Sequence, residues 1–226
     1  MILFDKVTKF YNGGPAALDD VTIKIEPGEF VSIVGHSGAG KSTLLKMIFA
    51  EEAPSEGAVY FDDCEVCQMN KLDLNSLRRR IGAVFQDFRL LPKKTVYENI
   101  AFAMEAAGKT DEEIEADVPY VLDLVDLSEK MDNFPHELSG GEQQRIAIAR
   151  AIVNQPDVVV ADEPTGNLDP ISTHEVVQIL KKINDLGTTV ILSTHNKDVI
   201  SSLGKRVITM DEGRVARDDS SGHFAL

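Results

Sequence analysis

The chain has 226 residues, of which 43% are hydrophobic, and it carries a formal net charge of -14. This length suits one compact α/β domain, and the negative charge argues against binding the phosphates of a nucleic acid. No apolar run approaches the roughly 20 residues of a membrane-spanning helix, and Met1 to Lys9 lack the pattern of a secretory signal, so we expect a cytoplasmic protein.

The N-terminal segment predicts a small antiparallel sheet. Leu3 to Phe10 and Val21 to Ile25 alternate apolar and polar residues, as strands with one buried face do. The cluster Asn12-Gly13-Gly14-Pro15 lies between them and is typical of a turn.

A phosphate-binding loop is predicted next. Phe30 to Val34 form a short apolar run, and the segment after it, Gly35-His36-Ser37-Gly38-Ala39-Gly40-Lys41-Ser42, matches G-x-x-x-x-G-K-[ST]. A helical pattern of apolar residues follows, so the motif has the expected strand and helix on its two sides. We assign the nucleotide phosphates to the backbone of this loop, through Thr43. Lys41 supplies a charge to the β- and γ-phosphates, and the Ser42 hydroxyl is a ligand for Mg²⁺.

The two cysteines, Cys64 and Cys67, form a single C-x-x-C. A structural zinc site needs a second pair of ligands, and a redox role needs a thioredoxin-like context, and the sequence offers neither. We interpret them as reduced thiols near a hairpin.

Between residues 87 and 150 the strand pattern stops, which predicts a helical insertion. Ile114, Val118, Val121 and Leu122 follow helical spacing behind a capping box at Thr110 and Glu113, while Pro119 predicts a kink or a restart of this helix. Further along, the Ser139 hydroxyl and two glycines precede the helical run Gln144 to Val153, which predicts a second anion site.

The C-terminal part predicts a doubly wound sheet. Val158 to Ala161, Val190 to Leu192 and Val207 to Met210 are short apolar runs separated by helical stretches, which favours parallel pairing. Asp162 ends the first run and is our candidate Mg²⁺ partner. Glu163 follows it and points differently, so we predict that Glu163 is the general base.

The segment Leu138-Ser139-Gly140-Gly141-Glu142-Gln143 resembles the signature of the ABC ATPases, and further landmarks of that family extend along the whole chain. The resemblance implies an α/β phosphate-loop ATPase with a RecA-like parallel-sheet core, an N-terminal antiparallel β subdomain and an inserted helical subdomain. It implies a single nucleotide-binding domain over residues 1–226, with the helical subdomain at about 87–150.

The same resemblance implies roles for individual residues. Tyr11 corresponds to the aromatic residue that stacks on adenine, and Gln86 to a glutamine that reaches the metal and the attacking water. His195 corresponds to the histidine that contacts the γ-phosphate, and Asp169 lies in a loop that crosses a dimer interface. Ser139, Gly140 and Gly141 are implied to face the phosphate loop of another copy, so that a head-to-tail homodimer encloses two ATP molecules.

Within the family, six segments resemble the ATPases of bacterial cell division, among them Leu90-Leu91-Pro92 and the run from Ala161 to Asp169. This implies a peripheral ATPase on the cytoplasmic face of the membrane, bound to an integral membrane protein and regulating peptidoglycan hydrolases. Two alternatives remain: the ATPase of a lipoprotein-release or macrolide exporter, and an ATP-binding scaffold with negligible hydrolysis. Intact Glu163 and His195 argue against the scaffold.

The membrane partner needs a docking surface, which the resemblance places between Gln86 and the helical insertion. We predict that it includes Phe88, Leu90, Leu91 and Tyr97, interrupted by Arg89, Lys93 and Lys94. The alternative is that these apolar side chains pack the insertion against the core.

Overall fold

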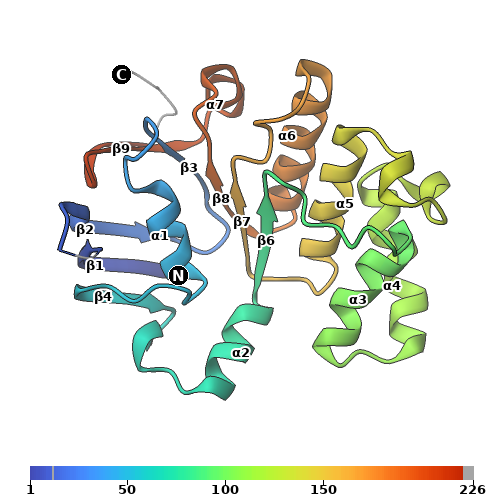
Figure 1. Cartoon of the computed structure of the whole chain (residues 1–226), viewed down its shortest axis with the longest axis horizontal. Coiled ribbons are helices and arrows are strands. Elements are labelled where there is room, and N and C mark those ends of the chain that lie inside the picture. Colours follow the sequence, from blue (N-terminus) through green and yellow to red (C-terminus); the bar gives the residue numbers. More distant parts are fainter. Residues whose placement is uncertain (12, 221–226) are drawn as a thin grey trace.

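The computed structural model describes residues 1–11 and 13–220, and it contains two sheets (Figure 1). The smaller sheet is antiparallel, in the order β2-β1-β4-β5. Its strands are β1 (Ile2–Phe10), β2 (Ala16–Ile25), β4 (Glu56–Phe61) and β5 (Cys64–Glu65). The predicted N-terminal antiparallel sheet is therefore confirmed, while Asn12 of the predicted turn lies outside the described residues.

The larger sheet has the order β10-β9-β3-β8-β7-β6. Its strands are β3 (Phe30–Val34), β6 (Ile81–Phe85), β7 (Val158–Asp162), β8 (Thr189–Ser193), β9 (Arg206–Asp211) and β10 (Arg214–Asp219). Every neighbouring pair is parallel except β9 and β10. The predicted parallel core is confirmed, and β10 adds an antiparallel edge strand.

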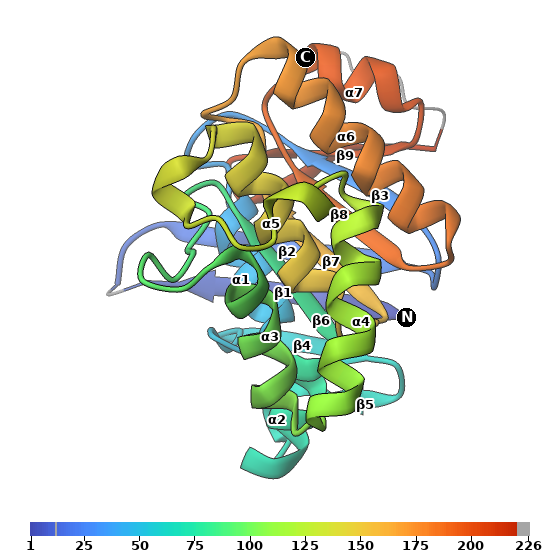
Figure 2. The same cartoon turned by 90° about the vertical axis from the view of Figure 1, so that its right-hand side faces the viewer.

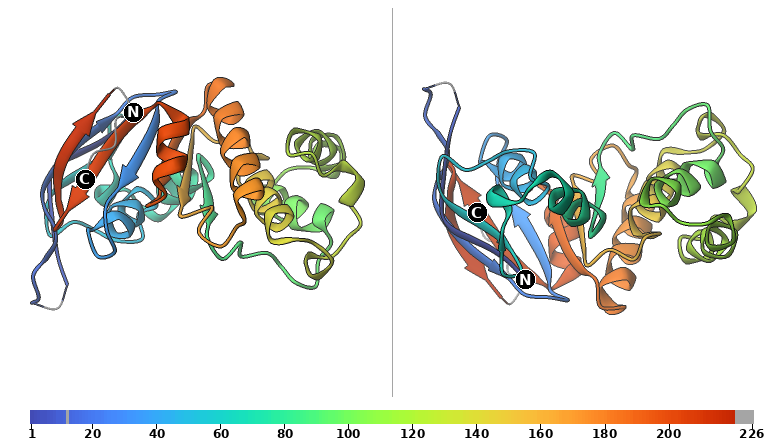
Figure 3. Two further views of the ribbon diagram at one scale, coloured as in Figure 1. Left: turned by 90° about the horizontal axis from the view of Figure 1, so that it is seen from above. Right: turned by 90° about the horizontal axis from the view of Figure 1, so that it is seen from below.

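Helices cover this sheet on both faces (Figure 3). On one side, α1 (Lys41–Ile48) contacts β2, β4 and β7, and its apolar residues share one buried cluster with both sheets. On the other side, α5 (Gly140–Ile152) contacts β6, and α6 (Pro170–Asp185) contacts β8 and α7 (Lys197–Leu203). The central strands β3, β7 and β8 are thus buried on both faces, which is why they are nearly continuous apolar runs.

The helices α3 (Val96–Ala107) and α4 (Asp111–Leu124) lie with α5 at one end of the molecule (Figures 1 and 2). The predicted capping box is present, with Thr110 accepting from the Glu113 N–H and Glu113 accepting from the Thr110 N–H. The alternative of a restart at Pro119 is wrong, because α4 continues through it. Val118, Val121 and Leu122 are buried, and this packing offsets the backbone donor that proline lacks.

Cys64 and Cys67 are exposed free thiols beside the β4–β5 hairpin and α2 (Lys71–Arg79). Among the described residues, no helix combines the length and the apolar character that a membrane span requires.

Candidate functional site

The phosphate loop connects β3 to α1 through backbone that only glycine adopts without strain. Gly35 has a φ of 151°, and a Cβ there would lie 2.3 Å from the Met210 carbonyl oxygen. Gly40, at the N-cap of α1, has a φ of 100°, and a Cβ would lie 2.6 Å from the Ala17 carbonyl oxygen. The loop is therefore pressed against β9 and β2, and only hydrogen fits at these two positions.

Lys41 holds this loop together from inside. Its Nζ donates to the Gly35 carbonyl at 2.7 Å and to the His36 carbonyl at 3.2 Å. The ammonium therefore lies over the cavity that the loop surrounds, where it is available to a phosphate oxygen.

Hard oxygen ligands meet at the mouth of the loop. The Ser42 hydroxyl donates to Asp162 Oδ2 across 3.4 Å, although the two residues are 120 positions apart in the sequence. Asp162 reaches this point because β7 pairs in parallel with β6 and β8, opposite Phe85 and Ser193. A hydroxyl and a carboxylate are ligands that Mg²⁺ accepts, so these residues fit the metal predicted from the sequence.

Glu163 and His195 face one another beside these ligands. The Nδ1 atom of His195 lies 3.0 Å from both carboxylate oxygens of Glu163. The Glu163 side chain is 19% exposed and that of His195 is 71% exposed, so the carboxylate is the sheltered partner. Glu163 has a φ of 48°, and its N–H donates to the Ser193 carbonyl, so the neighbouring strand fixes an unusual backbone conformation at this position.

These side chains line one cavity of about 560 Å³. Its walls are the loop residues from His36 to Thr43 together with Ala17, Gln86, Asp162, Glu163 and His195. Asp162 is the last residue of β7, and Gln86 and His195 come shortly after the ends of β6 and β8, so all three lie at the carboxyl edge where open parallel sheets place their ligands. The structure therefore brings together all of the residues predicted from the sequence to act in catalysis or to bind metal.

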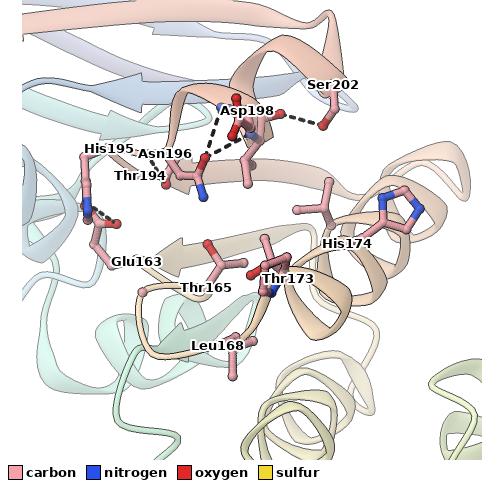
Figure 4. A pocket seen from close by; sticks show the side chains of 14 residues that line it. Glu163, Thr165, Leu168, Thr173, His174, Thr194, His195, Asn196, Asp198 and Ser202 are labelled. Carbon is pink, nitrogen blue, oxygen red and sulfur yellow. Dashed lines mark hydrogen bonds and ion pairs between the residues drawn. The ribbon is translucent and has the colours of Figure 1, made fainter.

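A second cavity, of about 430 Å³, adjoins the first and shares Glu163 and His195 with it (Figure 4). Its other side is formed by α6 and α7, including Thr173, Asp198 and Ser202. The Glu163–His195 pair thus lines both cavities, the one beside the phosphate loop and the one between α6 and α7.

Six predicted nucleotide-binding residues are not among the residues that line the first cavity: Tyr11, Gly35, Ser139, Gly140, Gly141 and Asp169. Tyr11 is 39% exposed, and Lys9 Nζ lies 5.1 Å from its ring centre. Asp169 is the N-cap of α6, where it accepts hydrogen bonds from the backbone of Ile171 and Ser172 and from the Ser172 hydroxyl. These bonds, the one from the Ser172 hydroxyl first, lower the pKa of Asp169.

Ser139 is the N-cap of α5 and forms a capping box with Glu142. The Ser139 oxygen accepts from the Glu142 N–H at 3.2 Å, and Glu142 Oε2 accepts from the N–H and the hydroxyl of Ser139, each at 2.8 Å. The bond from the Ser139 N–H is the largest cause that lowers the pKa of Glu142. Gly141 lies close to α6, because a Cβ there would be 2.4 Å from the Ser172 hydroxyl oxygen.

Two contacts at the site were missed in the sequence. Gln86 Nε2 donates to Asn167 Oδ1 at 3.1 Å, and His36 Nε2 lies 2.7 Å from Asp211 Oδ1. Asn167 could have been noticed because it precedes Leu168 and Asp169 in a loop already singled out. Asp211 carries no motif, and only the pairing of β9 with β3 places it here.

The model of the ABC transporter family matches residues 18–166 of the chain. The cell-division ATP-binding protein FtsE of Bacillus subtilis is 50% identical over 99% of this chain and 98% of its own length, and that of Escherichia coli is 45% identical over 95% and 97%.

Among solved structures, the dimeric post-hydrolysis state of the ATP-binding cassette MJ0796 bound to ADP and phosphate is similar with a TM-score of 0.87. It is 38% identical and covers 99% of this chain and 100% of that one. The cbiO1 protein of Clostridium perfringens has a TM-score of 0.90 at 31% identity, covering 98% and 88%. Both share the mixed-sheet fold predicted from the sequence. The chain therefore belongs to the ABC transporter family, as a subunit that binds and hydrolyses ATP.

Proposed function

We propose that this protein is the ATPase of a bacterial cell-division complex, working as a homodimer beneath a membrane protein that resembles FtsX and regulating peptidoglycan hydrolases from the cytoplasmic face of the membrane. The observation that carries this proposal is 45–51% identity, over nearly the whole chain, to several proteins named cell division ATP-binding protein FtsE. The chain itself would be one nucleotide-binding domain, residues 1–226, with a helical subdomain at about 87–150.

In the proposed reaction, the cavity beside the phosphate loop holds the triphosphate. The backbone from Gly35 to Thr43 and the Lys41 ammonium bind its phosphates. Ser42, Asp162 and Gln86 would hold Mg²⁺, which neutralises charge on the transferring phosphoryl group when bound. Their oxygen atoms suit such an ion, and Ser42 and Asp162 already lie in hydrogen-bond contact.

Glu163 is the proposed general base. Its carboxylate takes a proton from a water molecule as the water oxygen forms a bond to the γ-phosphorus, and the bond from that phosphorus to the bridging oxygen of ADP breaks. The contact of His195 Nδ1 with both oxygens of Glu163 fixes the orientation of the carboxylate. This arrangement favours real turnover over a scaffold that only binds ATP.

The site is completed by a second copy in this proposal. Ser139, Gly140 and Gly141 lie outside the described walls of the cavity, so they reach a phosphate only if they face another chain. One relative, the ATP-binding cassette MJ0796, is dimeric in two solved structures, one of them with ADP and phosphate bound. Tyr11 would stack on the adenine, and Asp169, which caps α6, would lie at the dimer interface in a head-to-tail arrangement.

The proposed docking groove for the membrane protein lies between α2, β6 and α3, and has a volume of about 510 Å³. Apolar side chains including Phe85, Leu91 and Phe102 line it, and Phe102 is 50% exposed. Four arginines also line it: Arg78, Arg79, Arg89 and Arg150. An apolar groove with a charged rim is typical of a partner site.

Only part of the predicted docking surface lines this groove, because Phe88, Lys93 and Lys94 are not among its lining residues. Leu91 and Arg89 line the groove, whereas Leu90 and Tyr97 are partly buried and pack against the apolar cluster that includes α3, α4 and α5. Leu90 and Tyr97 therefore pack the helical insertion against the core, as the alternative interpretation predicted. Leu91 is the residue whose substitution tests docking.

The test is co-purification of the membrane subunit with Leu91→Asp, beside Leu72→Asp as a control. Leu72 lies on α2 and is 77% exposed, so the control adds the same charge to a nearby surface. We expect Leu91→Asp to lose the membrane protein while keeping ATP binding and its melting transition, and Leu72→Asp to keep all three. Retention of the membrane protein, or a collapsed melting transition, would contradict the docking role.

The identity of the recovered protein tests the cell-division assignment. We expect a subunit with few membrane spans and an extracytoplasmic domain, whose loss blocks cleavage of the septal wall. Recovery of an efflux or lipoprotein-release subunit would replace this assignment with the exporter alternative and leave the ATPase assignment intact.

A further inference from the structure

His36, the second residue of the phosphate loop, has both of its ring nitrogens placed on oxygen acceptors. Nε2 lies 2.7 Å from Asp211 Oδ1, and Nδ1 lies 3.0 Å from the carbonyl oxygen of Ser37. An ionised carboxylate and a carbonyl can only accept hydrogen bonds. Both contacts are hydrogen bonds only when both nitrogens donate, and only the protonated imidazolium carries two N–H groups.

The sheet fixes this geometry. In the parallel pair β3–β9, Val34 lies opposite Thr209. His36 and Asp211 each come two residues later in the sequence, so they lie on the same side of the sheet edge. The close approach of Gly35 to the Met210 carbonyl holds the two segments together at this point. The register of β3 and β9 therefore places Asp211 beside His36.

The charges that act on His36 come from two elements. Asp211, at the end of β9, favours the protonated ring, and Lys41, at the start of α1, opposes it. The pKa of His36 is raised, first by the hydrogen bond to the Ser37 carbonyl and then by the one to Asp211. These hydrogen bonds thus outweigh the two effects that lower the pKa, which are first the desolvation of the ring and then the charge of Lys41.

His36 also belongs to the cavity that receives the phosphates. It lines that cavity, and its carbonyl oxygen accepts from Lys41 Nζ. We propose that His36 carries a positive charge there as a second cation beside Lys41, so that a proton on His36 strengthens the binding of the nucleotide triphosphate. This inference rests on the proposed use of the cavity for ATP.

The sign of the pH effect follows from linkage. An anion bound beside the imidazolium favours the protonated form, so the nucleotide is held more tightly below the pKa of His36 and less tightly above it. One charge across a partly solvated gap changes affinity by about threefold to tenfold. His36 is a binding residue in this account, because it acts on the phosphates, whereas the proton transfer is assigned to Glu163.

The first test measures the charge of His36 in the full chain without nucleotide. Imidazole signals are followed by NMR against pH, and His36→Gln identifies which of the five histidines is His36. We expect a midpoint above about 6.5, the ordinary value for histidine, and a return toward that value in Asp211→Asn. Glu212→Gln removes the same charge from the next, exposed residue and should leave the midpoint in place. A wild-type midpoint at or below about 6.5 overturns the proposal.

The second test measures the affinity for a non-hydrolysable ATP analogue with Mg²⁺ from pH 6 to pH 9. Protonation of the nucleotide is common to both proteins, so the comparison is between wild type and His36→Gln. We expect the wild type to lose about threefold to tenfold more affinity across this range. Equal losses in the two proteins overturn the proposal. If neither protein binds the analogue at any pH, the result counts against the proposed nucleotide site. The NMR titration of His36 tests its charge without nucleotide and so does not depend on that site.

Discussion

The two glycine-rich helix starts of this molecule are built in opposite ways. At α1, the N-cap is Gly40, which has no side chain to cap the helix, and the loop that leads into it lines a cavity together with Lys41. At α5, the N-cap is Ser139, and the Glu142 carboxylate occupies the N–H and the hydroxyl of that residue. The N-terminus of α1 is open to an anion, whereas the N-terminus of α5 already binds the carboxylate of its own Glu142.

The difference teaches what each start can do alone. An open helix start with its orphan N–H groups binds a phosphate within the same chain. A capping box satisfies two of those N–H groups internally and places a carboxylate at the helix N-terminus, so we expect a phosphate to bind there only together with a second surface. Both sites combine glycines with a helix N-terminus, and they differ in whether a side chain caps that helix.

The largest expected effect tests whether ATP hydrolysis takes place only at the phosphate loop that leads into α1. Glu163→Gln removes the proposed proton acceptor and should lower ATP turnover by roughly 10²-fold or more while ATP binding is kept. Turnover and nucleotide affinity are measured together, with the exposed Glu129→Gln as a control of equal charge change. Near-normal hydrolysis by Glu163→Gln would remove Glu163 from this role.

The next prediction tests whether the N-terminus of α5 in one chain completes the phosphate site at α1 of another chain. Lys41→Ala and Ser139→Arg should each be inactive, and an equal mixture should recover about one quarter of wild-type activity, since half of random dimers would each carry one intact site of two. ATPase activity is measured across mixing ratios, with heterodimers detected by differential tags. Heterodimers that form without recovering activity would contradict the shared site.

The smallest expected effect concerns the cap itself. Glu142→Ala should lower the free energy of unfolding by about 0.5–2 kcal/mol, as loss of a helix cap does. Glu113→Ala breaks the same capping box at α4, away from the phosphate cavity, and is the matched control. We expect similar melting temperatures in the two variants but altered ATPase activity only in Glu142→Ala.

The stabilisation by Glu142 should depend on pH in a definite direction. Its pKa is lowered in the folded chain, so the contribution is fully present above the unfolded pKa and is lost as pH falls through the folded one. The difference in stability between wild type and Glu142→Ala should therefore be constant near pH 7 and shrink below about pH 4. A difference that does not change with pH would show that the carboxylate charge is not what caps α5.

Local sequence determined the parts of this protein whose physics is local. The apolar runs predicted β3, β7, β8 and β9 closely, because a strand buried on both faces needs apolar residues at every position. The phosphate loop and the Thr110–Glu113 capping box were predicted for the same reason, since each is specified within a few neighbouring residues. The pattern Ser139-x-x-Glu142 is an equally local signal and was available to be found.

Tertiary structure decided what depends on which strands become neighbours. The short strand β6 carried no independent strand prediction, and β10 is an exposed edge strand of charged residues that shows no apolar pattern. The meeting of Ser42 with Asp162 and of His36 with Asp211 required the strand order β9-β3-β8-β7. The inward packing of Leu90 and Tyr97 required α3 to α5 to be in place. A residue type and its spacing specify the chemistry of a side chain, but its partners are set by the register and order of strands that are distant in the sequence.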